Sequence, residues 1–407
     1  MFRTHRTTTT VGSTTPGRWR LTAVAVAAAG LTLAGCGTTG GDEEPTAGDD
    51  PSADASESTG GEEATCSPTT LAFLGPQTGP YANLGINIVD GAKVKIEEFN
   101  AENPDCEITL KTFDSQGDPE KATPLAVQIA GDDSILGVIG PTFSGESEAT
   151  GPAFAEAGLV TVSASATNPA LTQNGWDTFH RILGNDATQA PAVATYMRDT
   201  IGSKQAFVVD DASEYGKGLA DGVREDLGDL VIDNDTVQQG QTDFSATVTK
   251  VKASGADSLF YGGYYAEAGL FFKQLRAGGY QGAFISGDGS KDPGFVESAG
   301  GPKAAEGAVL TCPCAPAPAE FATAYKEMSG NEPGTYSAEG YDVAQIFTEA
   351  VSSGAADRQA MLDFVNGYDG EGITKQITFD ETGEIADVVI YAYEVKGGDT
   401  NTGEPIE

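Results

Sequence analysis

The chain is poor in basic residues. Its 407 residues include 23 Lys and Arg against 60 Asp and Glu, and its formal net charge is −37 at pH 7. Nucleic-acid-binding proteins need a basic surface, and so do proteins held by anionic lipid headgroups. We therefore expect no nucleic-acid partner, and we expect the acidic surface to keep the protein soluble.

Histidine and catalytic motifs are scarce too. Of the two histidines, His180 lies between Phe179 and Arg181 without an evident partner, so a structural or solvated role fits it better than that of a general base. The glycines after the first predicted strand lack dinucleotide-binding spacing, and neither a P-loop nor a Gly-x-Ser-x-Gly elbow is present. We expect no enzyme activity, no cofactor and no metal site.

The apolar run at the N-terminus is too short to span a membrane. It extends from Leu21 to Leu33, whereas a spanning helix needs about 20 residues. Four arginines and no acidic residue precede it, as in a secretory signal. The tetrad that ends in Cys36 resembles the bacterial lipobox, in which the Cys is acylated. We expect residues 1–35 to be a lipoprotein signal peptide and Cys36 to carry a lipid.

Residues 36–65 contain the lipidated Cys and a linker without basic or aromatic residues. Such a segment cannot bury enough apolar surface to fold, so we expect a disordered acidic tether. The remainder is long enough for two lobes.

Four cysteines remain besides Cys36. An even number in an exported protein suggests disulfides. Cys66 and Cys106 each open a predicted strand, and neighbouring strands would bring them within bridging distance. Cys312 and Cys314 could close on each other or belong to a metal site, although the metal is disfavoured because no second Cys pair exists.

Strand and helix patterns alternate through the remaining chain. Ile135–Gly140 is a buried-strand pattern, whereas Ala268, Phe271, Phe272 and Leu275 have helical spacing. Alternation predicts an α/β fold with parallel sheets covered by helices, and its restart near residue 185 predicts two such sheets. The last strand is expected at Ala386–Val395.

Small polar and aromatic residues follow the predicted strands, at the sheet edge where α/β proteins bind ligands. In the first half, Ser144, Ser165 and Thr167 offer hydroxyl and backbone groups, and a helix start near Ser144 would suit an anion. In the second half, Tyr215 and Tyr264 offer aromatic walls. Asp288 offers a negative group for an ammonium.

These stretches resemble the leucine/isoleucine/valine-binding type of extracellular solute receptor. The resemblance covers about residues 67–395. Its most specific parts are Gly75–Gly85, Ile139–Ser144, Ser163–Thr172 and the segment from Glu214 to Ala220. The family's type I periplasmic-binding fold implies two Rossmann-like lobes joined by three crossovers, near 185, 310–315 and 383–387. Lobe 1 would comprise 67–184 plus 313–384 and lobe 2 would comprise 185–312 plus 385–396, followed by a tail at 397–407.

The resemblance also implies a role for each polar residue. Ser144 and Thr167 would hold the ligand's α-carboxylate, and the backbone carbonyl of Ser165 would help to hold its α-ammonium. Tyr215 and Tyr264 would line the pocket, and Asp288 would meet the ammonium.

There are three departures from the family pattern. Leu84 stands where an aromatic ring often lines the pocket, Phe143 stands where some members have a disulfide Cys, and Asp288 is shorter than the usual Glu. They leave the side-chain specificity open.

The function that follows is the extracytoplasmic substrate-binding component of an ABC transporter, which captures a small amino acid, branched-chain or similar, by lobe closure. Its partners would be the ligand, the permease subunits and the membrane that its lipid anchor enters, with the protein itself a monomer on the outer face of the bacterial cell membrane. The alternative is a lipid-anchored sensor of the same fold for an amide, urea or an aromatic acid.

Overall fold

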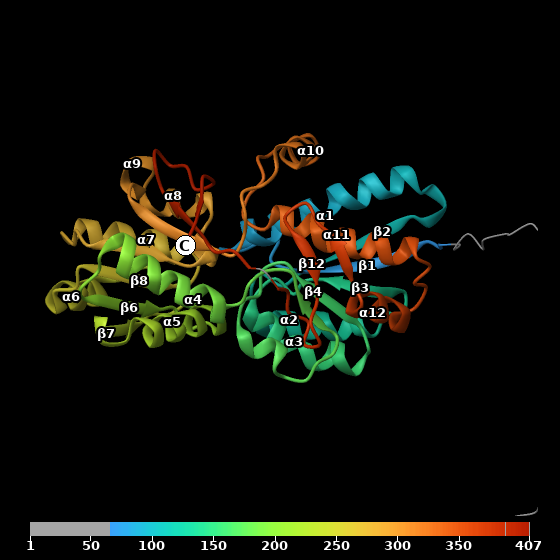
Figure 1. The fold of residues 1–407 in the computed structure, drawn as a ribbon, viewed down its shortest axis with the longest axis horizontal. Coiled ribbons are helices and arrows are strands. Elements are labelled where there is room, and N and C mark those ends of the chain that lie inside the picture. Colours follow the sequence, from blue (N-terminus) through green and yellow to red (C-terminus); the bar gives the residue numbers. More distant parts are fainter. Residues whose placement is uncertain (1–65, 387, 407) are drawn as a thin grey trace, which may run out of the picture. The chain divides into compact units, whose positions relative to one another are not determined.

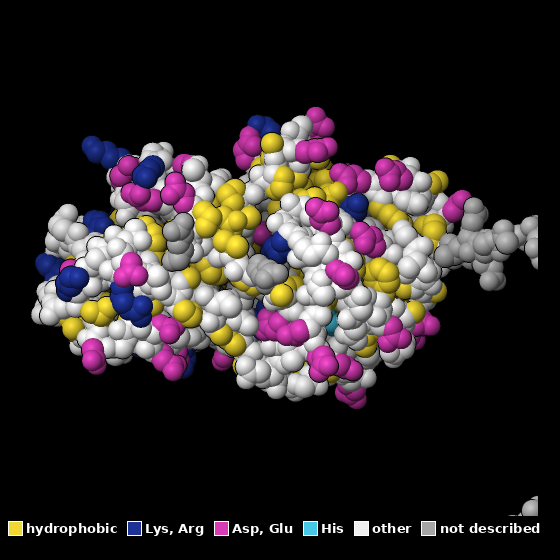
Figure 2. Space-filling model, viewed as in Figure 1, with side chains coloured by type: hydrophobic (Ala, Val, Ile, Leu, Met, Phe, Trp, Pro, Cys, Tyr) yellow, Lys and Arg dark blue, Asp and Glu magenta, His cyan; other side chains and the backbone are white. Residues whose placement is uncertain are grey.

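The structure, a computed structural model, describes residues 66–386 and 388–406. The predicted signal peptide, Cys36 and the linker lie outside the described residues. Within the described part, no helix combines the length and the apolar content needed to cross a bilayer. Figure 2 shows Asp and Glu side chains spread over the viewed face, in keeping with the acidic composition.

The first lobe is built on a parallel five-stranded sheet in the order β2-β1-β3-β4-β5. The strands are β1 (Thr69–Gly75), β2 (Ile108–Asp114), β3 (Ile135–Ile139), β4 (Val160–Ser163) and β5 (Phe179–Arg181). The helices are α1 (Ala82–Glu102), α2 (Pro119–Ala130), α3 (Ser144–Glu156), α10 (Ala319–Ser329), α11 (Ser337–Ser352) and α12 (Arg358–Asn366). Shorter pieces are η1 (Pro104–Cys106), η2 (Pro169–Thr172) and the hairpin β11 (Asp369–Glu371) with β12 (Gln376–Thr378).

The second lobe contains a seven-stranded sheet in the order β14-β13-β10-β9-β8-β6-β7. Figure 1 labels β6, β7 and β8 of this sheet. Its strands are β6 (Ala206–Asp210), β7 (Val231–Thr236), β8 (Ser258–Gly262), β9 (Ala283–Ser286), β10 (Ala308–Cys312), β13 (Tyr391–Glu394) and β14 (Glu404–Pro405). Strands β6 to β10 are parallel, while β13 and β14 are antiparallel additions at one edge.

The helices of the second lobe are α4 (Asp186–Thr195), α5 (Glu214–Leu227), α6 (Ser245–Ser254), α7 (Tyr265–Ala277), α8 (Pro293–Ala299) and α9 (Pro302–Ala305). Shorter turns are η3 (Tyr196–Ile201), η4 (Gly228–Leu230) and η5 (Asp288–Ser290). The alternation of strand and helix thus yields two α/β lobes, as the sequence predicts.

The chain passes between the lobes three times. It crosses after β5 into α4, after β10 into α10, and between β12 and β13. The third passage explains why the last strand is shorter than the predicted Ala386–Val395. Gly184 of the first passage is so close to Val388 that an added Cβ would lie 2.2 Å from Val388 Cγ1, so this stretch still belongs to the hinge.

Two helices of the first lobe approach each other unusually closely. A Cβ on Gly91 of α1 would lie 1.9 Å from the Ser337 carbonyl oxygen, and one on Gly340 of α11 would lie 2.2 Å from the Ile88 carbonyl oxygen. Both positions therefore require glycine. The close packing sets the N-terminus of α11 beside α1, where both helices meet the space between the lobes.

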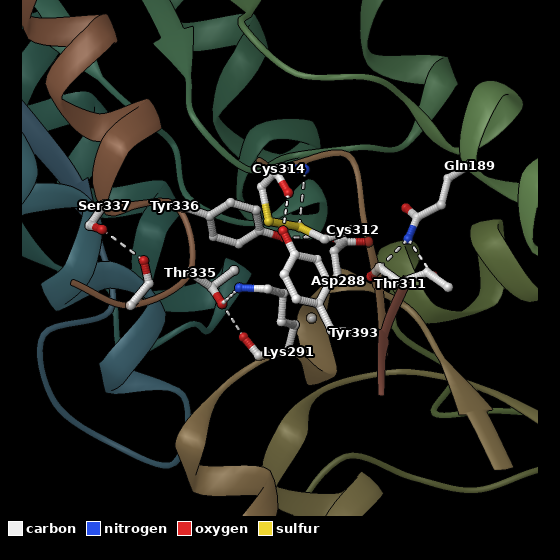
Figure 3. Close-up of a disulfide and its surroundings, with 12 residues drawn as sticks. Gln189, Asp288, Lys291, Thr311, Cys312, Cys314, Thr335, Tyr336, Ser337 and Tyr393 are labelled. Atoms are coloured by element: carbon white, nitrogen blue, oxygen red, sulfur yellow. Dashed lines mark hydrogen bonds between the residues drawn. A yellow bond between two sulfur atoms is a disulfide. The ribbon is translucent and has the colours of Figure 1, made fainter. Parts of the chain in front are cut away.

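Disulfides join both remaining cysteine pairs. Cys66 and Cys106 connect the segments that lead into β1 and β2, with their Cα atoms 5.4 Å apart. Cys312 and Cys314 close on each other at the second passage between the lobes (Figure 3). Within the described residues, no cluster of three or more His, Cys, Asp or Glu could hold a metal ion.

The C-terminal residues are not only a tail. The pairing of β14 with β13 extends the second sheet by one strand, and Thr400 is buried. This corrects the expectation that residues 397–407 lie outside the second lobe. Strand β14 contains two residues, Glu404 and Pro405, and a pattern of two residues is too short to predict a strand.

Candidate functional site: a closed cleft between the lobes

A narrow cavity lies between the lobes, at the carboxyl ends of strands from both sheets. The lining residues are Leu84, Phe143, Ser144, Ser165, Tyr215, Tyr264, Asp288, Gly289 and Tyr336. Five of the six predicted ligand residues are therefore brought together. They converge because the loops that follow parallel strands all open at the same edge of a sheet.

The first lobe offers hydrogen-bond donors. Helix α3 begins at Ser144, so its first free N–H groups and the positive end of its dipole face the cavity. The Ser144 Oγ accepts a hydrogen bond from the Asn168 N–H at 3.2 Å, which leaves its own proton to be donated. This end of the cavity suits a carboxylate.

The second lobe offers a carboxylate. Asp288 is 1% exposed, and its Oδ1 accepts a hydrogen bond from the Tyr215 hydroxyl at 2.9 Å. Its Oδ2 accepts one from the Tyr336 hydroxyl, which comes from the first lobe. The Gly289 N–H donates to the Tyr215 oxygen at 2.8 Å, so this hydroxyl is held in position from behind. Burial raises the pKa of Asp288, and the two tyrosines oppose that rise.

Aromatic rings close the cavity on its remaining sides. The ring centroid of Tyr264 lies 4.6 Å from that of Phe143 and 5.2 Å from that of Tyr215. Tyr81 stacks behind them, 4.8 Å from Tyr264, and its hydroxyl donates to Glu267 Oε1 of the second lobe at 2.8 Å. Leu84 is an aliphatic wall, as its place in the sequence suggested.

Thr167 is the predicted ligand residue that the cavity does not include. It is fully buried, and its hydroxyl lies beside the carboxylate of Asp186 at the first passage between the lobes, where neither group has a hydrogen bond of standard geometry. That this hydroxyl holds the ligand's carboxylate stays a prediction, since Thr167 Oγ1 has no hydrogen-bond partner among the described residues.

Asp186 is a second buried carboxyl group near Asp288. Burial, together with the charge of Asp288, raises the pKa of Asp186 to about 8. Burial also raises the pKa of Asp288, so the two carboxyl groups titrate as a coupled pair.

The cleft is closed. The Asn83 side-chain amide donates to Asp292 Oδ1 at 2.8 Å, and the Asn168 amide donates to the Glu214 carbonyl at 3.1 Å, each across the two lobes. The cavity has a volume of about 10 Å³, room for about one water molecule. An amino acid can therefore enter only when the lobes separate.

A buried arginine supports the loop that carries Ser165. Arg181 is fully buried at the end of β5, and its guanidinium donates to the Ala166 carbonyl at 2.8 Å and to the Asn168 carbonyl at 3.0 Å. It also forms a 2.9 Å ion pair with Glu384, which belongs to the third passage between the lobes. One side chain thus ties the ligand loop to the hinge.

Sequence reasoning missed Tyr81, Tyr336 and Asp186. Tyr336 lies beyond the second passage and reaches the site only because α11 packs on α1. Tyr81 follows a Gly-Pro turn, and its partner Glu267 is 186 residues away along the chain. A signal did exist for Asp186, which follows the capping residue Asn185 and is the first residue of α4.

Comparison with known proteins identifies a family and relatives that this chain resembles. A family model described as periplasmic binding protein matches residues 68–400. The leucine-specific-binding protein of Salmonella typhimurium is 30% identical over 328 residues, which cover 77% of this chain and 87% of that relative. The amino acid binding protein of Pseudomonas aeruginosa is 29% identical over 339 residues, which cover 80% of this chain and 90% of that relative.

A solved structure agrees with this grouping. The branched-chain amino acid transporter substrate binding protein LivJ of Streptococcus pneumoniae, crystallised with isoleucine, superposes with a TM-score of 0.77 at 26% identity. The match covers 83% of this chain and 99% of that one.

Proposed function

Because this chain belongs to the periplasmic binding protein family, we propose that it is the extracytoplasmic substrate-binding component of an ABC importer for a branched-chain or similar amino acid. Relatives named for amino-acid binding support the ligand class, and the transporter named for the S. pneumoniae structure supports a permease partner. The role is one of binding and release rather than of catalysis.

The observation that carries the proposal is that each lobe supplies groups for one of the two charges of an amino acid. Helix α3 of the first lobe presents N–H groups and Ser144, while the second lobe presents the Asp288 carboxylate. A zwitterionic amino acid matches both ends at once, and only when the lobes are together. Closure around such a ligand is a hinge motion of the kind that this architecture performs.

The aliphatic side chain of the ligand would lie among Leu84, Phe143 and Tyr264. Isothermal titration of the mature chain should therefore give saturable binding of leucine, isoleucine and valine with one site of highest affinity. Benzoate lacks the ammonium, and urea lacks both charged groups. Each should therefore bind more weakly or not at all. Tight binding of benzoate without binding of leucine would replace this proposal with the sensor or carrier of an aromatic acid.

We propose, further, that the protein is attached to the outer face of the cell membrane through lipid on Cys36. The support is the sequence that surrounds it, with a charged segment, a short apolar run and small residues before the Cys. Two acyl-type anchors hold a protein stably, whereas a single chain binds only marginally.

Cys36→Ala should prevent this attachment. Metabolic labelling with a radioactive fatty acid, followed by fractionation, should find label in the membrane-bound wild type and none in the variant, which is released or stays as precursor. Cys66→Ala is the matched control, because that residue lies in a disulfide and should leave the label in place. Label that survives in the Cys36→Ala protein would contradict the proposal.

A further inference from the structure

A second cavity lies beside the hinge, on the other side of Tyr336 from the ligand cleft. It has a volume of about 220 Å³, many times the roughly 10–15 Å³ that one water requires. Its walls include Ala315, Pro316 and Ala317 from the second passage. Its polar residues are Lys291, Glu332, Tyr336, Ser337, Glu339 and Asn401. We call it the hinge pocket.

The cation of the hinge pocket is incompletely paired. Lys291, which directly follows η5, is 4% exposed, and its ammonium makes one hydrogen bond, to Thr335 Oγ1 at 3.3 Å (Figure 3). The same ammonium lies 4.3 Å from the centre of the Tyr393 ring. Within the described ranges, no carboxylate forms an ion pair with it. An ammonium can donate three hydrogen bonds, so Lys291 has donors to spare.

The anion of the hinge pocket is incompletely paired as well. Glu339, in the first turn of α11, is 1% exposed, and its Oε1 has no hydrogen-bond partner among the described residues. Burial, together with the charge of Asp342, raises the pKa of Glu339, and the charges of Lys375 and Lys291 oppose that rise. Burial lowers the pKa of Lys291 to about 8, and the charge of Glu339 opposes that fall. The two groups therefore interact electrostatically across the pocket without forming an ion pair.

A buried cation and a buried anion that line one cavity without contact are costly to keep apart. We propose that the hinge pocket is a second binding site, which takes a small zwitterion with its carboxylate on Lys291 and its ammonium on Glu339. The Ala-Pro-Ala wall leaves space for a hydrogen atom or a short aliphatic side chain, so small amino acids such as glycine or alanine fit the class.

This site is coupled to closure. Lys291 belongs to the second lobe and Glu339 to the first, so a zwitterion that bridges them binds the closed form. Tyr336 lines both cavities and donates to Asp288 in the ligand cleft. Occupation of the hinge pocket therefore raises the affinity of the cleft for its ligand, and the reverse holds by thermodynamic reciprocity.

Equilibrium dialysis of radioactive glycine against the mature chain tests the proposal. The measurement is made with excess unlabelled leucine, which blocks the cleft, so that bound glycine reports the hinge pocket. We expect saturable binding of about one glycine per chain. Lys291→Met and Glu339→Gln should each weaken it by about tenfold or more, because each leaves one end of the zwitterion without its partner. Acetate and methylammonium, which carry one charge each, should compete poorly.

Matched controls separate the pocket from general effects of charge. Lys303→Met and Glu327→Gln change exposed residues of the same types and should leave glycine binding unchanged. Thermal unfolding shows whether each variant folds, and Lys291→Arg keeps the cation should the Met variant fail. Asp288→Asn should weaken leucine binding by about thirtyfold or more but keep glycine binding, so failure of the cleft and failure of the hinge pocket give different results. Absence of saturable glycine binding, or equal binding by wild type and the Lys291→Met/Glu339→Gln double variant, overturns the proposal.

Discussion

Asp288→Asn weakens the binding of leucine by about thirtyfold or more. Removing one partner of a buried charged pair costs about 2–5 kcal/mol, and about 1.4 kcal/mol corresponds to tenfold in affinity. The amide has nearly the shape of the carboxylate, so the hydroxyls of Tyr215 and Tyr336 keep their neighbour while the ammonium loses its counter-charge. Calorimetric titration of both proteins gives the ratio directly.

A ligand without the ammonium tests whether this loss of affinity comes from the charge. 4-Methylpentanoate has the shape of leucine without the ammonium, so its affinity should change much less in the variant. Asp229→Asn, an exposed change in the same lobe, is the matched control. Because burial raises the pKa of Asp288, the affinity of the wild type for leucine falls as the pH drops through that raised pKa. A variant that binds leucine as tightly as the wild type would move the ammonium to another part of the cleft.

Arg181→Met lowers the free energy of unfolding by about 3–5 kcal/mol. The substitution leaves the partly buried Glu384 carboxylate without its cation, and it removes a donor from the carbonyls of Ala166 and Asn168. Urea unfolding followed by circular dichroism measures the loss. Leucine affinity should fall as well, since the loop that carries Ser165 loses its support.

Two further variants make the Arg181 result specific. Arg198→Met removes an exposed guanidinium from the second lobe and should change the unfolding free energy by no more than about 0.5 kcal/mol. Arg181→Lys keeps the charge but not the planar fork that reaches two carbonyls and a carboxylate together, so an intermediate loss is expected. If Arg181→Met were no more costly than Arg198→Met, the ion pair at the hinge would be dispensable.

The elements that the sequence predicted well are those with a local physical cause. Asp118 caps α2 by accepting the Glu120 N–H, and Pro119 occupies the first helical position where its missing N–H costs nothing. The same Asp-Pro signal recurs at Asp292 and Pro293, where α8 begins. Strand β5 could not be predicted in this way. Its three residues, Phe179 to Arg181, are too few and too polar to form a buried-strand pattern, and their burial comes from the hinge that covers them.

The residues of the ligand cleft also differ in whether they could be predicted from a local signal. Ser144, Ser165, Tyr215, Tyr264 and Asp288 follow strands. Because parallel strands end at one edge of a sheet and their positions can be predicted from the alternating pattern, the convergence of these residues could be predicted. Tyr336 could not, because its position depends on how closely α11 approaches α1 after two passages between the lobes. The neighbour of Thr167 could not be predicted either, because a strand end fixes where a residue lies, not that the buried carboxyl group of Asp186 is beside its side chain.

The disulfide between Cys66 and Cys106 bears on how the protein resists a pull on its N-terminal side. β1 lies inside the first sheet, between β2 and β3, and the bridge joins the chain just before β1 to the chain just before β2. A force applied at Cys66 is therefore divided between two adjacent strands that run in the same direction. It acts along both of them, so that whole ladders of hydrogen bonds must shear together, and it cannot open β1 from its neighbour one bond at a time. The load reaches the sheet at the amino ends of its strands, at the edge opposite the cleft.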